Sequence, residues 1–528
     1  MEKLTGGEII VRCLENRGVE VVFGIPGEHN IEIYRALGKS PIRHITPRHE
    51  QGAGFMADAY ARVTGKIGVA IVVTGPGLTN IATPMAQAYT DSIPLLVISG
   101  QVRSDLIGKG GHFHELKDQI GFSSALVDWS RTVKSAEEIP AIMERAITDL
   151  ASGTARGVHL EFPQDILLAS TPVSFSVAAE HLASSPSQFD LQRAATVLAT
   201  AHSPGLIVGG GGRYSGSELL VIAERIGAPI LTTWRGSGAV PTIHPLSVGL
   251  ATEFRAAKTF FETCDTLLIV GTELSETDFF PSFPKTNARI VRIDHNPKRI
   301  NRGCLVEVGL VADAQRAAHE LGIELESHEQ RQNTGSSRAA ALRNEIDREA
   351  AAQAAPYRAI VETIRAALPP HAILTCDLTG PVYYAVSRYF PVDIPNRILM
   401  SGLGTLGYSI PAGIGAKLAN SDCPVVALVG DGGFMFTVSE LMTAAELGLN
   451  LVIVVWNNKG FGDIRRQMIE SGARTVGVDL VSPDFEALAK GFRCVGVTVE
   501  KPLHLRQELE YALGRSCPTV IEIPSMDN

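Results

Sequence analysis

The stretch GDGGFMFTVSELMTAAELGLNLVIVVWNN, residues 430–458, decides the fold, because it places polar residues directly after two apolar runs. PVVALVG and LNLVIVVW have the length and composition of buried strands, and FTVSELMTAAELG between them has the spacing of an amphipathic helix. In a parallel βαβ unit both strands point the same way. We therefore expect Asp431, Asn457 and Asn458 at one carboxyl edge of a sheet, where open α/β sheets bind ligands.

The glycines around Asp431 predict an anion site. Gly430, Gly432 and Gly433 let backbone amides approach an anion at the start of a helix. An anion beside Asp431 needs a cation between them, and Mg²⁺ bridges carboxylate, amide and phosphate oxygens. The stretch therefore predicts a Mg²⁺–diphosphate site, although each half alone also fits a helix cap or a turn.

The length, net charge, apolar runs and cysteines of the chain exclude several classes of protein. A chain of 528 residues is too long for one core, so two or three domains are expected. The net charge of −9 disfavours a nucleic-acid partner, and no apolar run approaches a membrane span. The N-terminal residues lack an apolar signal segment, and the seven cysteines are scattered without a CxxC pair. We expect a soluble cytoplasmic protein with no membrane partner.

Short β-rich runs alternate with helical patterns along the chain, which predicts an α/β protein with parallel sheets in three domains. VEVVFGIPG, GVAIVVTGPG and IPLLVISGQ lie in the first block, PGLIVGGGG and TLLIVGTEL in the second, and AILTCDLTG and PTVIEIP in the third. The Ser- and Pro-rich stretch 170–187 predicts a linker, and the polar stretch 327–355 predicts a linker that leads into a helix.

The spacing GDG-x24-NN resembles the cofactor motif of thiamine diphosphate (ThDP) enzymes of the pyruvate decarboxylase and acetolactate synthase superfamily, and the likeness covers essentially the whole chain. It implies a pyrimidine-binding domain at 1–170, a middle Rossmann-like domain at 186–325 and a diphosphate-binding domain at 352–528. It also implies that Asp431, the Asn458 side chain and the Gly460 carbonyl hold Mg²⁺. Gly432, Gly433 and Phe461 would join Asp431 and Asn458 as ThDP contacts.

ThDP chemistry requires a carboxyl group that exchanges a proton with the aminopyrimidine of the cofactor. RHEQGAGFMADAYAR resembles the glutamate motif of the family and assigns this role to Glu50, which could otherwise only begin a helix. SGLGTLGYSIPAGIGAKLA resembles the segment that folds the cofactor, with Leu406 as an apolar wedge and the Gly404 carbonyl as an acceptor. The alternative for Leu406 is a place in the core. Thr379 and Gly380, at a predicted strand end, are expected to add diphosphate contacts.

Two segments of the first domain resemble substrate-binding parts of the family. GIPGEHN resembles the first turn, with Gly27 at the pocket and Glu28 where pyruvate decarboxylases place an acid. GGHFHELKDQ resembles the Phe-Gln-Glu loop of acetolactate synthases, so Phe113 and His114 would face the pocket and His114 could shuttle protons. The alternatives are a solvated loop, or zinc binding by His112 and His114, for which no further ligands occur at zinc spacing.

KGFGDIRRQM follows the asparagine pair and places Asp463 and Ile464 in the substrate pocket by the same alignment. Pyruvate decarboxylases carry glutamate in place of Ile464, and acetolactate synthases carry tryptophan in place of Gln467, so the chain departs from both patterns. The alternative for Asp463 is a salt bridge to Arg465 or Arg466.

The acids near the predicted pocket favour a substrate with a cationic tail. Asp463, Glu28 and either Glu276 or Asp278 could surround a bound 2-oxo acid, and carboxylates pair well with Arg-like groups. The resemblance is greatest to bacterial 5-guanidino-2-oxopentanoate decarboxylases, through PRHEQGAGFMADAYARVTGK, TGPGLTNIATPMAQAYTDSIP and GVDLVSPDF.

The middle domain departs from acetolactate synthases, which bind FAD there. The family has an Arg-Phe-Asp-Asp-Arg run where this chain has TELSETDFF, and GGGGRYSG, residues 209–216, is out of register with GxGxxG. We expect a middle domain without a nucleotide, and FAD stays an open alternative.

The resemblance implies a ThDP- and Mg²⁺-dependent, non-oxidative 2-oxo acid decarboxylase, with His114 and Glu28 as proton handlers and 5-guanidino-2-oxopentanoate as the substrate. The alternative is an acetolactate synthase-type carboligase acting on pyruvate. Because the family places the pyrimidine on one subunit and the diphosphate on another, a homodimer or homotetramer with active sites at the subunit interface is expected.

Overall fold

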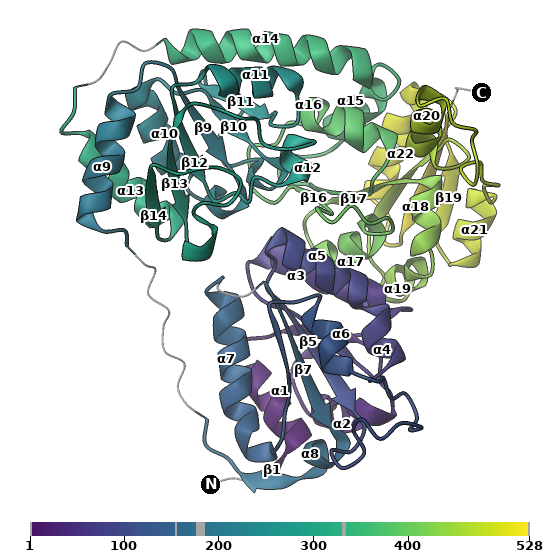
Figure 1. Ribbon diagram of the computed structural model, residues 1–528. Coiled ribbons are helices and arrows are strands. Elements are labelled where there is room, and N and C mark those ends of the chain that lie inside the picture. The colour runs from purple at the N-terminus through teal and green to yellow at the C-terminus, as the bar shows by residue number, and fades with distance from the viewer. Residues whose placement is uncertain (1–2, 154–155, 176–184, 330–333, 526–528) are drawn as a thin grey trace.

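The computed structural model describes residues 3–153, 156–175, 185–329 and 334–525. Three α/β units follow one another along the chain, and Figure 1 shows the N-terminal unit below the middle unit and the C-terminal unit. Each unit contains a six-stranded sheet in which every pair of neighbouring strands is parallel. The predicted fold class is confirmed.

The N-terminal sheet has the order β3-β2-β4-β5-β7-β6. Its strands are β2 (Val21–Gly24), β3 (Arg43–Ile45), β4 (Gly68–Val72), β5 (Leu95–Gln101), β6 (Trp129–Thr132) and β7 (Gly157–Pro163). The main helices are α1 (Gly6–Asn16), α2 (Ile31–Leu37), α3 (Glu50–Thr64), α4 (Pro76–Asn80), α5 (Ala82–Asp91), α6 (Gln119–Ser124), α7 (Ile139–Ala151) and α8 (Gln164–Leu168).

The stretch 170–187, predicted as a linker, begins as a strand. β8 (Ser170–Pro172) pairs antiparallel with β1 (Lys3–Thr5). Residues 176–184 of this stretch lie outside the described residues. Local composition did not reveal β8, because its partner is at the other end of the unit.

The middle sheet has the order β11-β10-β9-β12-β13-β14. Its strands are β9 (Pro204–Val208), β10 (Ile230–Thr232), β11 (Ser247–Leu250), β12 (Thr266–Val270), β13 (Arg289–Asp294) and β14 (Val308–Val311). Its helices are α9 (Gln188–Ala199), α10 (Gly216–Ile226), α11 (Arg255–Thr263), α12 (Glu276–Phe279) and α13 (Ala314–Leu325). α14 (Gly335–Ala354) crosses over α11 toward the C-terminal unit (Figure 1).

The C-terminal sheet has the order β16-β15-β17-β18-β20-β19. Its strands are β15 (Ile373–Cys376), β16 (Ile398–Met400), β17 (Val425–Gly430), β18 (Val452–Asn457), β19 (Val495–Thr498) and β20 (Thr519–Pro524). Its main helices are α15 (Arg358–Ala367), α17 (Ser409–Ala419), α18 (Asp431–Phe436), α19 (Glu440–Glu446), α20 (Gly462–Glu470), α21 (Phe485–Gly491) and α22 (Pro502–Leu513).

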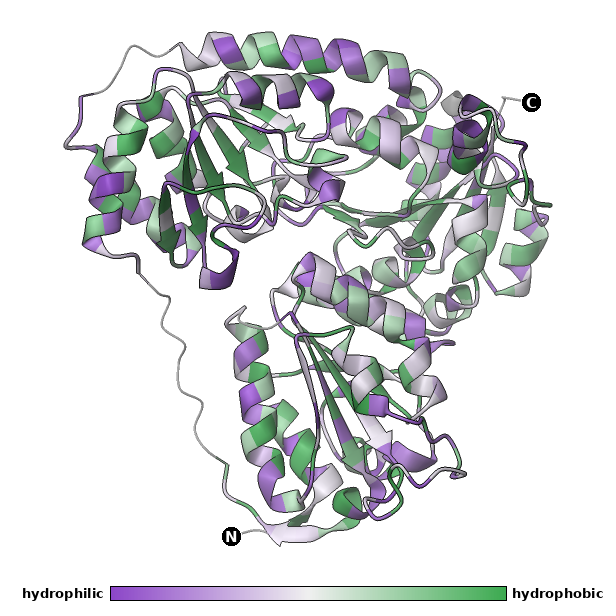
Figure 2. Cartoon of the chain, viewed as in Figure 1, coloured by the Kyte–Doolittle hydropathy of each residue, from purple (hydrophilic) through white to green (hydrophobic). Residues whose placement is uncertain are grey.

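The strands are buried on both faces, which explains their continuous apolar runs. Every residue of β4, β5, β12 and β18 is buried. Figure 2 shows hydrophobic strands covered by helices that are hydrophobic on one side and hydrophilic on the other. No helix among the described residues is long and apolar enough to cross a membrane.

α3 and α17 join the N-terminal and C-terminal units into one apolar core (Figure 1). Small residues allow the two helices to approach closely: a Cβ added to Gly415 would lie 2.2 Å from the Met56 carbonyl oxygen. A buried polar group crosses the same interface. Arg62 pairs with Asp58 at 2.7 Å and with Asp91 at 2.6 Å, and the Tyr408 hydroxyl donates to Asp58 at 2.8 Å. These contacts fix the position of α3, and with it Glu50, relative to the C-terminal unit.

Candidate active site

Three oxygen atoms meet at the carboxyl edge of the C-terminal sheet. The side-chain oxygen of Asn458 lies 2.8 Å from the carbonyl oxygen of Gly460 and 3.1 Å from Oδ1 of Asp431. Asp431 begins α18 after β17, and Asn458 follows β18, the neighbouring strand. Such a cluster of acceptors is repulsive unless the amide rotates or a cation lies between the oxygens. The structure therefore brings together the three residues predicted to hold Mg²⁺, as a set of hard oxygen donors.

Asp431 has the environment of a metal ligand. It is 3% exposed, and burial raises the pKa of its carboxyl group while a hydrogen bond from Ser482 opposes the rise. Among the described residues, no lysine or arginine forms an ion pair with it. A divalent cation would supply the missing positive charge, so these residues fit Mg²⁺. Asn457 has a structural role instead, because its amide group donates to Glu522 at 2.6 Å and accepts from Lys459 and Ser482.

The loop that carries the Gly460 carbonyl packs against the backbone of Val478. Gly460 has φ 145°, and a Cβ there would lie 2.0 Å from the Val478 carbonyl oxygen. The Phe461 amide donates to that same oxygen at 2.9 Å, and Arg465 donates to the Lys459 carbonyl at 3.0 Å. Gly432 makes room for the Phe461 ring, which would lie 2.8 Å from a Cβ at that position. The geometry of the loop around Gly460 thus depends on glycine at two positions.

Replacing Gly460 by alanine is expected to lower the free energy of unfolding by roughly 1–3 kcal/mol, because alanine is strained at this φ and its Cβ meets a carbonyl oxygen. Chemical denaturation of the apoprotein measures the change. Gly491→Ala is the matched control, since a Cβ there has no neighbour within 4 Å. Equal stabilities of the two variants would contradict the strained loop.

The neighbouring strand β15 ends in a carboxylate that organises the loop around Leu406. Asp377 is buried, and its carboxylate accepts from the Leu378 amide at 2.9 Å and from the Gly407 amide at 2.7 Å. Burial raises the pKa of Asp377 to about 6, against these hydrogen bonds. Leu406 is half-buried and lies outside the apolar clusters of the described residues, so the core alternative for it is not observed.

The other residues predicted around the diphosphate lie at the same edge. Gly404 is exposed with φ 82°. Thr379 is buried, and its hydroxyl oxygen would lie 2.9 Å from a Cβ at Gly430. Gly380 packs against the Tyr357 ring, and Gly433 leaves room for the Asp377 carboxylate, which would lie 3.0 Å from a Cβ there. The structure thus surrounds the three-oxygen cluster with small residues and backbone.

In the N-terminal unit, one turn contacts three of the predicted sites. The turn formed by residues 73–77 leaves β4 and runs into the first two residues of α4. Gly27 packs on Val73, with the Val73 Cγ2 atom 3.1 Å from its would-be Cβ. Gly75 has φ 64° and lies against the backbone of His114. A Cβ added to Gly77 would lie 3.5 Å from Oε1 of Glu50. Residues 27, 50 and 114, far apart in the sequence, are therefore neighbours.

Glu50 is the first residue of α3 and is 7% exposed. The Asn80 side chain donates to its Oε2 atom at 2.9 Å, which leaves Oε1 without a hydrogen-bond donor among the described residues. The backbone before Glu50 is held by the C-terminal unit, because the Glu440 carboxylate accepts from the amides of Arg48 at 3.0 Å and His49 at 3.1 Å. Burial raises the pKa of Glu440 to about 7.

The loop with His114 stacks aromatic rings near this turn. The rings of Phe113 and His114 have centroids 3.8 Å apart, and His29 lies 5.5 Å from His114. Nδ1 of His114 and Nδ1 of His29 are buried without a hydrogen-bond partner among the described residues. Burial lowers the pKa of His29, whereas Glu28 raises it. Phe113 is 65% exposed, and Glu28 is exposed as well.

The predicted tail-binding residues have other contacts in this structure. Asp463 accepts from the Tyr384 hydroxyl at 2.5 Å, and from Arg466 and Gln467 at 2.7 Å, so the salt-bridge alternative is observed with Arg466. The Tyr384 and Arg466 contacts lower the pKa of Asp463 against the opposing effect of burial. Ile464 is exposed on the same helix, α20. Hydrogen bonds and ion pairs of the described residues do not link this group to Glu50, Glu28 or His114.

Three of the glycines after β9 have amides that are bonded to neighbouring backbone carbonyls. The Gly209 amide donates to the Val270 carbonyl at 2.8 Å, the Gly211 amide to Gly271 at 2.9 Å, and the Gly212 amide to Gly209 at 3.0 Å. Because these glycines have no side chains, the segments that follow β9 and β12 pack closely together.

Two carboxylates that position the site, Asp377 and Glu440, were not predicted from the sequence. Asp377 directly precedes Leu378, Thr379 and Gly380 in the sequence. An acid at the end of a predicted buried strand is the feature that could have indicated its role. Glu440 reaches a segment almost four hundred residues earlier, and no local pattern indicates such a contact.

Comparison with known proteins agrees with this geometry. Residues 4–122 match the N-terminal TPP binding domain of thiamine pyrophosphate enzymes, residues 191–321 the central domain and residues 379–523 the C-terminal TPP binding domain.

Several curated proteins are similar over nearly the whole chain. A probable 2-ketoarginine decarboxylase of Pseudomonas aeruginosa is 40% identical over 98% of this chain and 94% of its own length. The large subunit of acetolactate synthase isozyme 3 of Escherichia coli is 33% identical over 97% and 93%, and an acetolactate synthase of Mycobacterium bovis is 31% identical over 99% and 88%. With all three domains matched, the chain belongs to the thiamine pyrophosphate enzyme family.

Proposed function

We propose that this thiamine pyrophosphate enzyme is a non-oxidative, Mg²⁺-dependent decarboxylase of 5-guanidino-2-oxopentanoate, the compound also called 2-ketoarginine. The observation that carries the proposal is the 40% identity over 98% of the chain to a probable 2-ketoarginine decarboxylase, against 33% or less to the acetolactate synthases named above.

The oxygen cluster supports the cofactor assignment. Asp431, Asn458 and the Gly460 carbonyl would hold Mg²⁺, and Thr379, Gly380, Gly432, Gly433 and Phe461 would surround the diphosphate. When bound, thiamine diphosphate supplies a nucleophilic carbon and an electron sink for loss of CO₂. Leu406 and the Gly404 carbonyl would orient it, through the loop that Asp377 holds.

Proton transfer is assigned to two places in the N-terminal unit. Oε1 of Glu50 would exchange a proton with the aminopyrimidine, since Oε2 already accepts from Asn80. Nδ1 of His114, buried and without a partner among the described residues, would deliver the proton that completes the aldehyde product, with Glu28 nearby.

The guanidinium tail requires a carboxylate that can face it. Asp463 lies at the start of α20, beside the loop that carries the Gly460 carbonyl. Glu28 is exposed and precedes His29. Asp463 must exchange its contact with Arg466 for the substrate, whereas Glu28 is available as it stands. Both groups would pair with a guanidinium in a bidentate manner.

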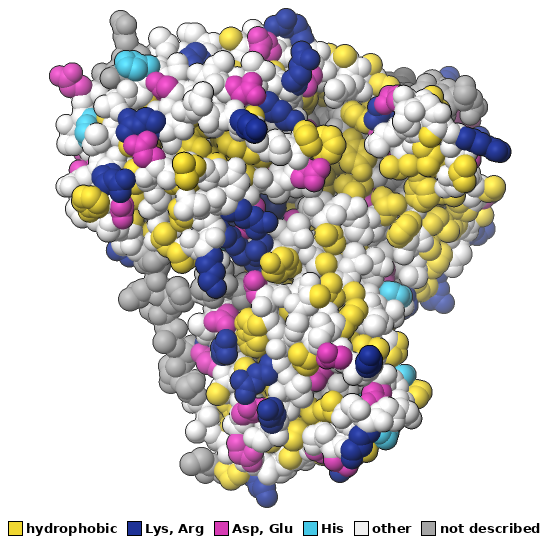
Figure 3. All heavy atoms as spheres, in the orientation of Figure 1, with side chains coloured by type: hydrophobic (Ala, Val, Ile, Leu, Met, Phe, Trp, Pro, Cys, Tyr) yellow, Lys and Arg dark blue, Asp and Glu magenta, His cyan; other side chains and the backbone are white. Residues whose placement is uncertain are grey.

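We also propose that the active site forms between subunits. The Glu50 group and the Asp431 group lie in different units without a shared hydrogen bond among the described residues. Apolar side chains next to the oxygen cluster are exposed, including Phe436 at 55% and Val481 at 99%. Figure 3 shows hydrophobic side chains on the surface of the C-terminal unit. Burial of these groups in a homodimer or homotetramer would enclose the site.

A substrate panel tests the proposal. Purified protein with and without ThDP and Mg²⁺ is given the guanidino acid, its neutral 5-ureido analogue, pyruvate, and phenyl and branched 2-oxo acids. We expect cofactor-dependent CO₂ and aldehyde from the guanidino acid, with kcat/KM on the order of tenfold to a hundredfold above the ureido analogue, because the analogue lacks the charge. Acetolactate formation from pyruvate as the fastest reaction would instead establish the carboligase.

A further inference from the structure

A buried polar group lies inside the N-terminal unit, beside the turn that follows β4. Its centre is Gln119, the first residue of α6, which is 3% exposed. The Gln119 side-chain nitrogen donates to Oε2 of Glu161 at 2.8 Å and to the Gly100 carbonyl at 3.1 Å. The Gln119 side-chain oxygen accepts from the Thr74 hydroxyl at 2.6 Å and from the Gly75 amide at 3.1 Å. One side chain therefore joins β5 and β7 to this turn.

The orientation of the Gln119 amide follows from its neighbours. The backbone N–H of Gly75 can only donate, and an ionised carboxylate such as that of Glu161 can only accept. The oxygen of Gln119 therefore faces the turn, and its nitrogen faces the carboxylate. A planar amide supplies an acceptor and two donors in opposite directions, and the site uses both.

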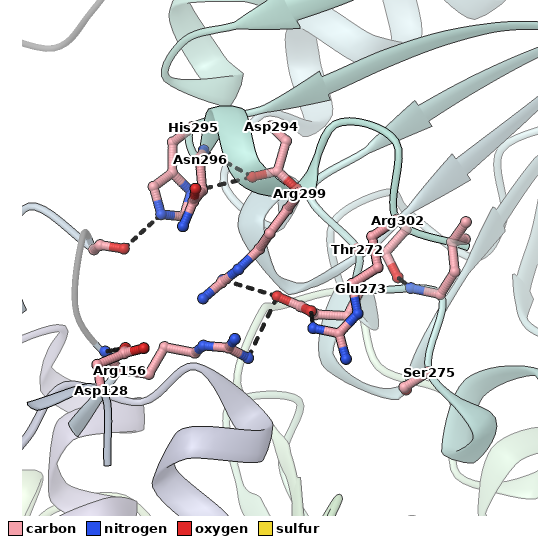
Figure 4. Close-up of polar contacts among 12 residues, drawn as sticks. Asp128, Arg156, Thr272, Glu273, Ser275, Asp294, His295, Asn296, Arg299 and Arg302 are labelled. Atoms are coloured by element: carbon pink, nitrogen blue, oxygen red, sulfur yellow. Dashed lines mark hydrogen bonds and ion pairs between the residues drawn. The ribbon is translucent and has the colours of Figure 1, made fainter. Parts of the chain in front are cut away.

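Glu161 anchors the nitrogen end of Gln119. It is 1% exposed, and burial raises the pKa of its carboxyl group. Its partners among the described residues are uncharged: Gln119, the Gln101 amide at 3.2 Å and the Thr132 hydroxyl at 2.5 Å. Glu273 differs, because Figure 4 shows arginine side chains directed at its carboxylate. A carboxylate that no cation neutralises binds amide donors strongly, which holds Gln119 in place.

The turn that Gln119 holds contacts both groups to which proton transfer is assigned. A Cβ at Gly75 would lie 2.1 Å from the His114 carbonyl oxygen, and a Cβ at Gly77 would lie 3.5 Å from Oε1 of Glu50. His114 precedes Gln119 on the same loop and has φ 63°, which is uncommon for a residue with a side chain. Its backbone therefore depends on support from its surroundings.

A second side chain supports the other end of the His114 loop. The Glu115 carboxylate accepts from the amides of Gly108 and Gly110 at 3.1 Å and from the His112 amide at 3.2 Å. These bonds lie within the loop, whereas those of Gln119 reach the turn and the sheet. Gln119 thus sets the position of the loop relative to the rest of the unit.

We propose that Gln119 is a positioning residue, which fixes the turn of residues 73–77 and thereby holds His114 and Glu50 in their relative positions. The proposal rests on the proposed function, in which these two groups transfer protons. Gln119 acts through the backbone of the turn. Because a displacement of about 1 Å in an active site can lower the rate by on the order of 100-fold, such support affects catalysis.

Gln119→Met tests the proposal, because methionine has a similar length but neither the amide donor nor its acceptor. With the 2-oxo acid that the enzyme turns over fastest, we expect kcat to fall about tenfold to a hundredfold and KM to change less than about threefold, since the change acts on proton transfer rather than on substrate binding. Thr132→Val is the matched control. It removes another hydrogen bond of Glu161 and leaves the contacts of Gln119 with the turn in place, so its kcat should stay close to that of the unchanged protein.

Amide hydrogen exchange of the full chain, with and without ThDP and Mg²⁺, gives a readout that needs no substrate. Residues 73–77 and 112–118 should exchange faster in Gln119→Met than in Thr132→Val, because the turn has lost its support. β18 should keep its protection in both variants, which shows that the chain is folded. If no 2-oxo acid is turned over, the proposed function fails, and hydrogen exchange still decides whether Gln119 holds the turn.

Gln119→Glu separates lost hydrogen bonds from lost packing. A protonated carboxyl group can donate to Glu161 and accept from Gly75, whereas an ionised one repels Glu161. Two carboxyl groups in contact share a proton, and burial and Asp118 further favour the protonated form. His159 reaches Gln119 through a serine hydroxyl and stays neutral, because burial lowers its pKa to about 3. We expect Gln119→Glu to keep its kcat at low pH and to lose it as the pH rises through the raised pKa of the pair.

Three results would overturn the proposal. They are unchanged hydrogen exchange of residues 73–77 in Gln119→Met, equal kcat in Gln119→Met and Thr132→Val, and a pH profile of Gln119→Glu that matches the unchanged protein. If Gln119→Met does not fold, the pH profile of Gln119→Glu decides.

Discussion

Replacement of Glu50 by glutamine is expected to lower kcat by on the order of 10²–10⁴ while ThDP and Mg²⁺ still bind. The amide has the shape of the carboxyl group and can keep its contact with Asn80, but it cannot exchange a proton. The oxygens of Asp431, Asn458 and Gly460 that are proposed to hold Mg²⁺ lie in the C-terminal unit, so their geometry should not change. Steady-state decarboxylation and calorimetric cofactor titration measure the two effects separately.

Glu446→Gln is the matched control for this experiment. Glu446 is an exposed acid that pairs with Arg48, two residues before Glu50, and exposed pairs contribute about 0–1 kcal/mol. Its kcat should stay close to that of the unchanged protein. Retained turnover in Glu50→Gln, or loss of cofactor binding together with turnover, would refute the assigned role of Glu50.

Replacement of Asp431 by asparagine is expected to weaken Mg²⁺ binding by roughly 100-fold or more, since even the outer partners of metal ligands contribute 10–100-fold. The variant keeps three oxygen donors but loses the only negative charge among them. ThDP affinity should fall with that of the metal, because the diphosphate then lacks its counter-ion.

Thermal unfolding gives a second measurement of the Asp431 effect. Ligands at about 100 times their Kd stabilise a protein by about 2.7 kcal/mol, so the cofactors should raise the Tm of the unchanged protein but not that of Asp431→Asn. Asp422→Asn is the control, since Asp422 is exposed and lies before β17, at the opposite edge of the same sheet. A normal Mg²⁺ affinity in Asp431→Asn would mean that the oxygen cluster does not hold the metal.

The sequence was sufficient to predict the layers of the fold because buried parallel strands are apolar on both faces. The run LVIVVW became β18 in the centre of a sheet, and the glycines and asparagine after the strands marked the edge where the oxygen atoms meet. The resemblance to ThDP enzymes placed Glu50, Gly27 and His114 in one site, and the structure shows that residues 73–77 touch all three segments.

What the sequence did not indicate depends on contacts between distant segments. Glu440 lies in an ordinary amphipathic helix, and only the packing of two units directs its carboxylate to the amides of Arg48 and His49. The same holds for β8, which forms only because β1 lies beside it. Side-chain roles set by tertiary packing leave no periodic signal.

The burial of α3 has a consequence for protein engineering. Twelve of its fifteen residues are buried, and much of that surface is covered by the C-terminal unit through α17. A truncated N-terminal unit would expose an apolar helix and is expected to aggregate. Chimaeras that exchange N-terminal units between relatives, in order to transfer substrate preference, should therefore carry the matching α17 with them.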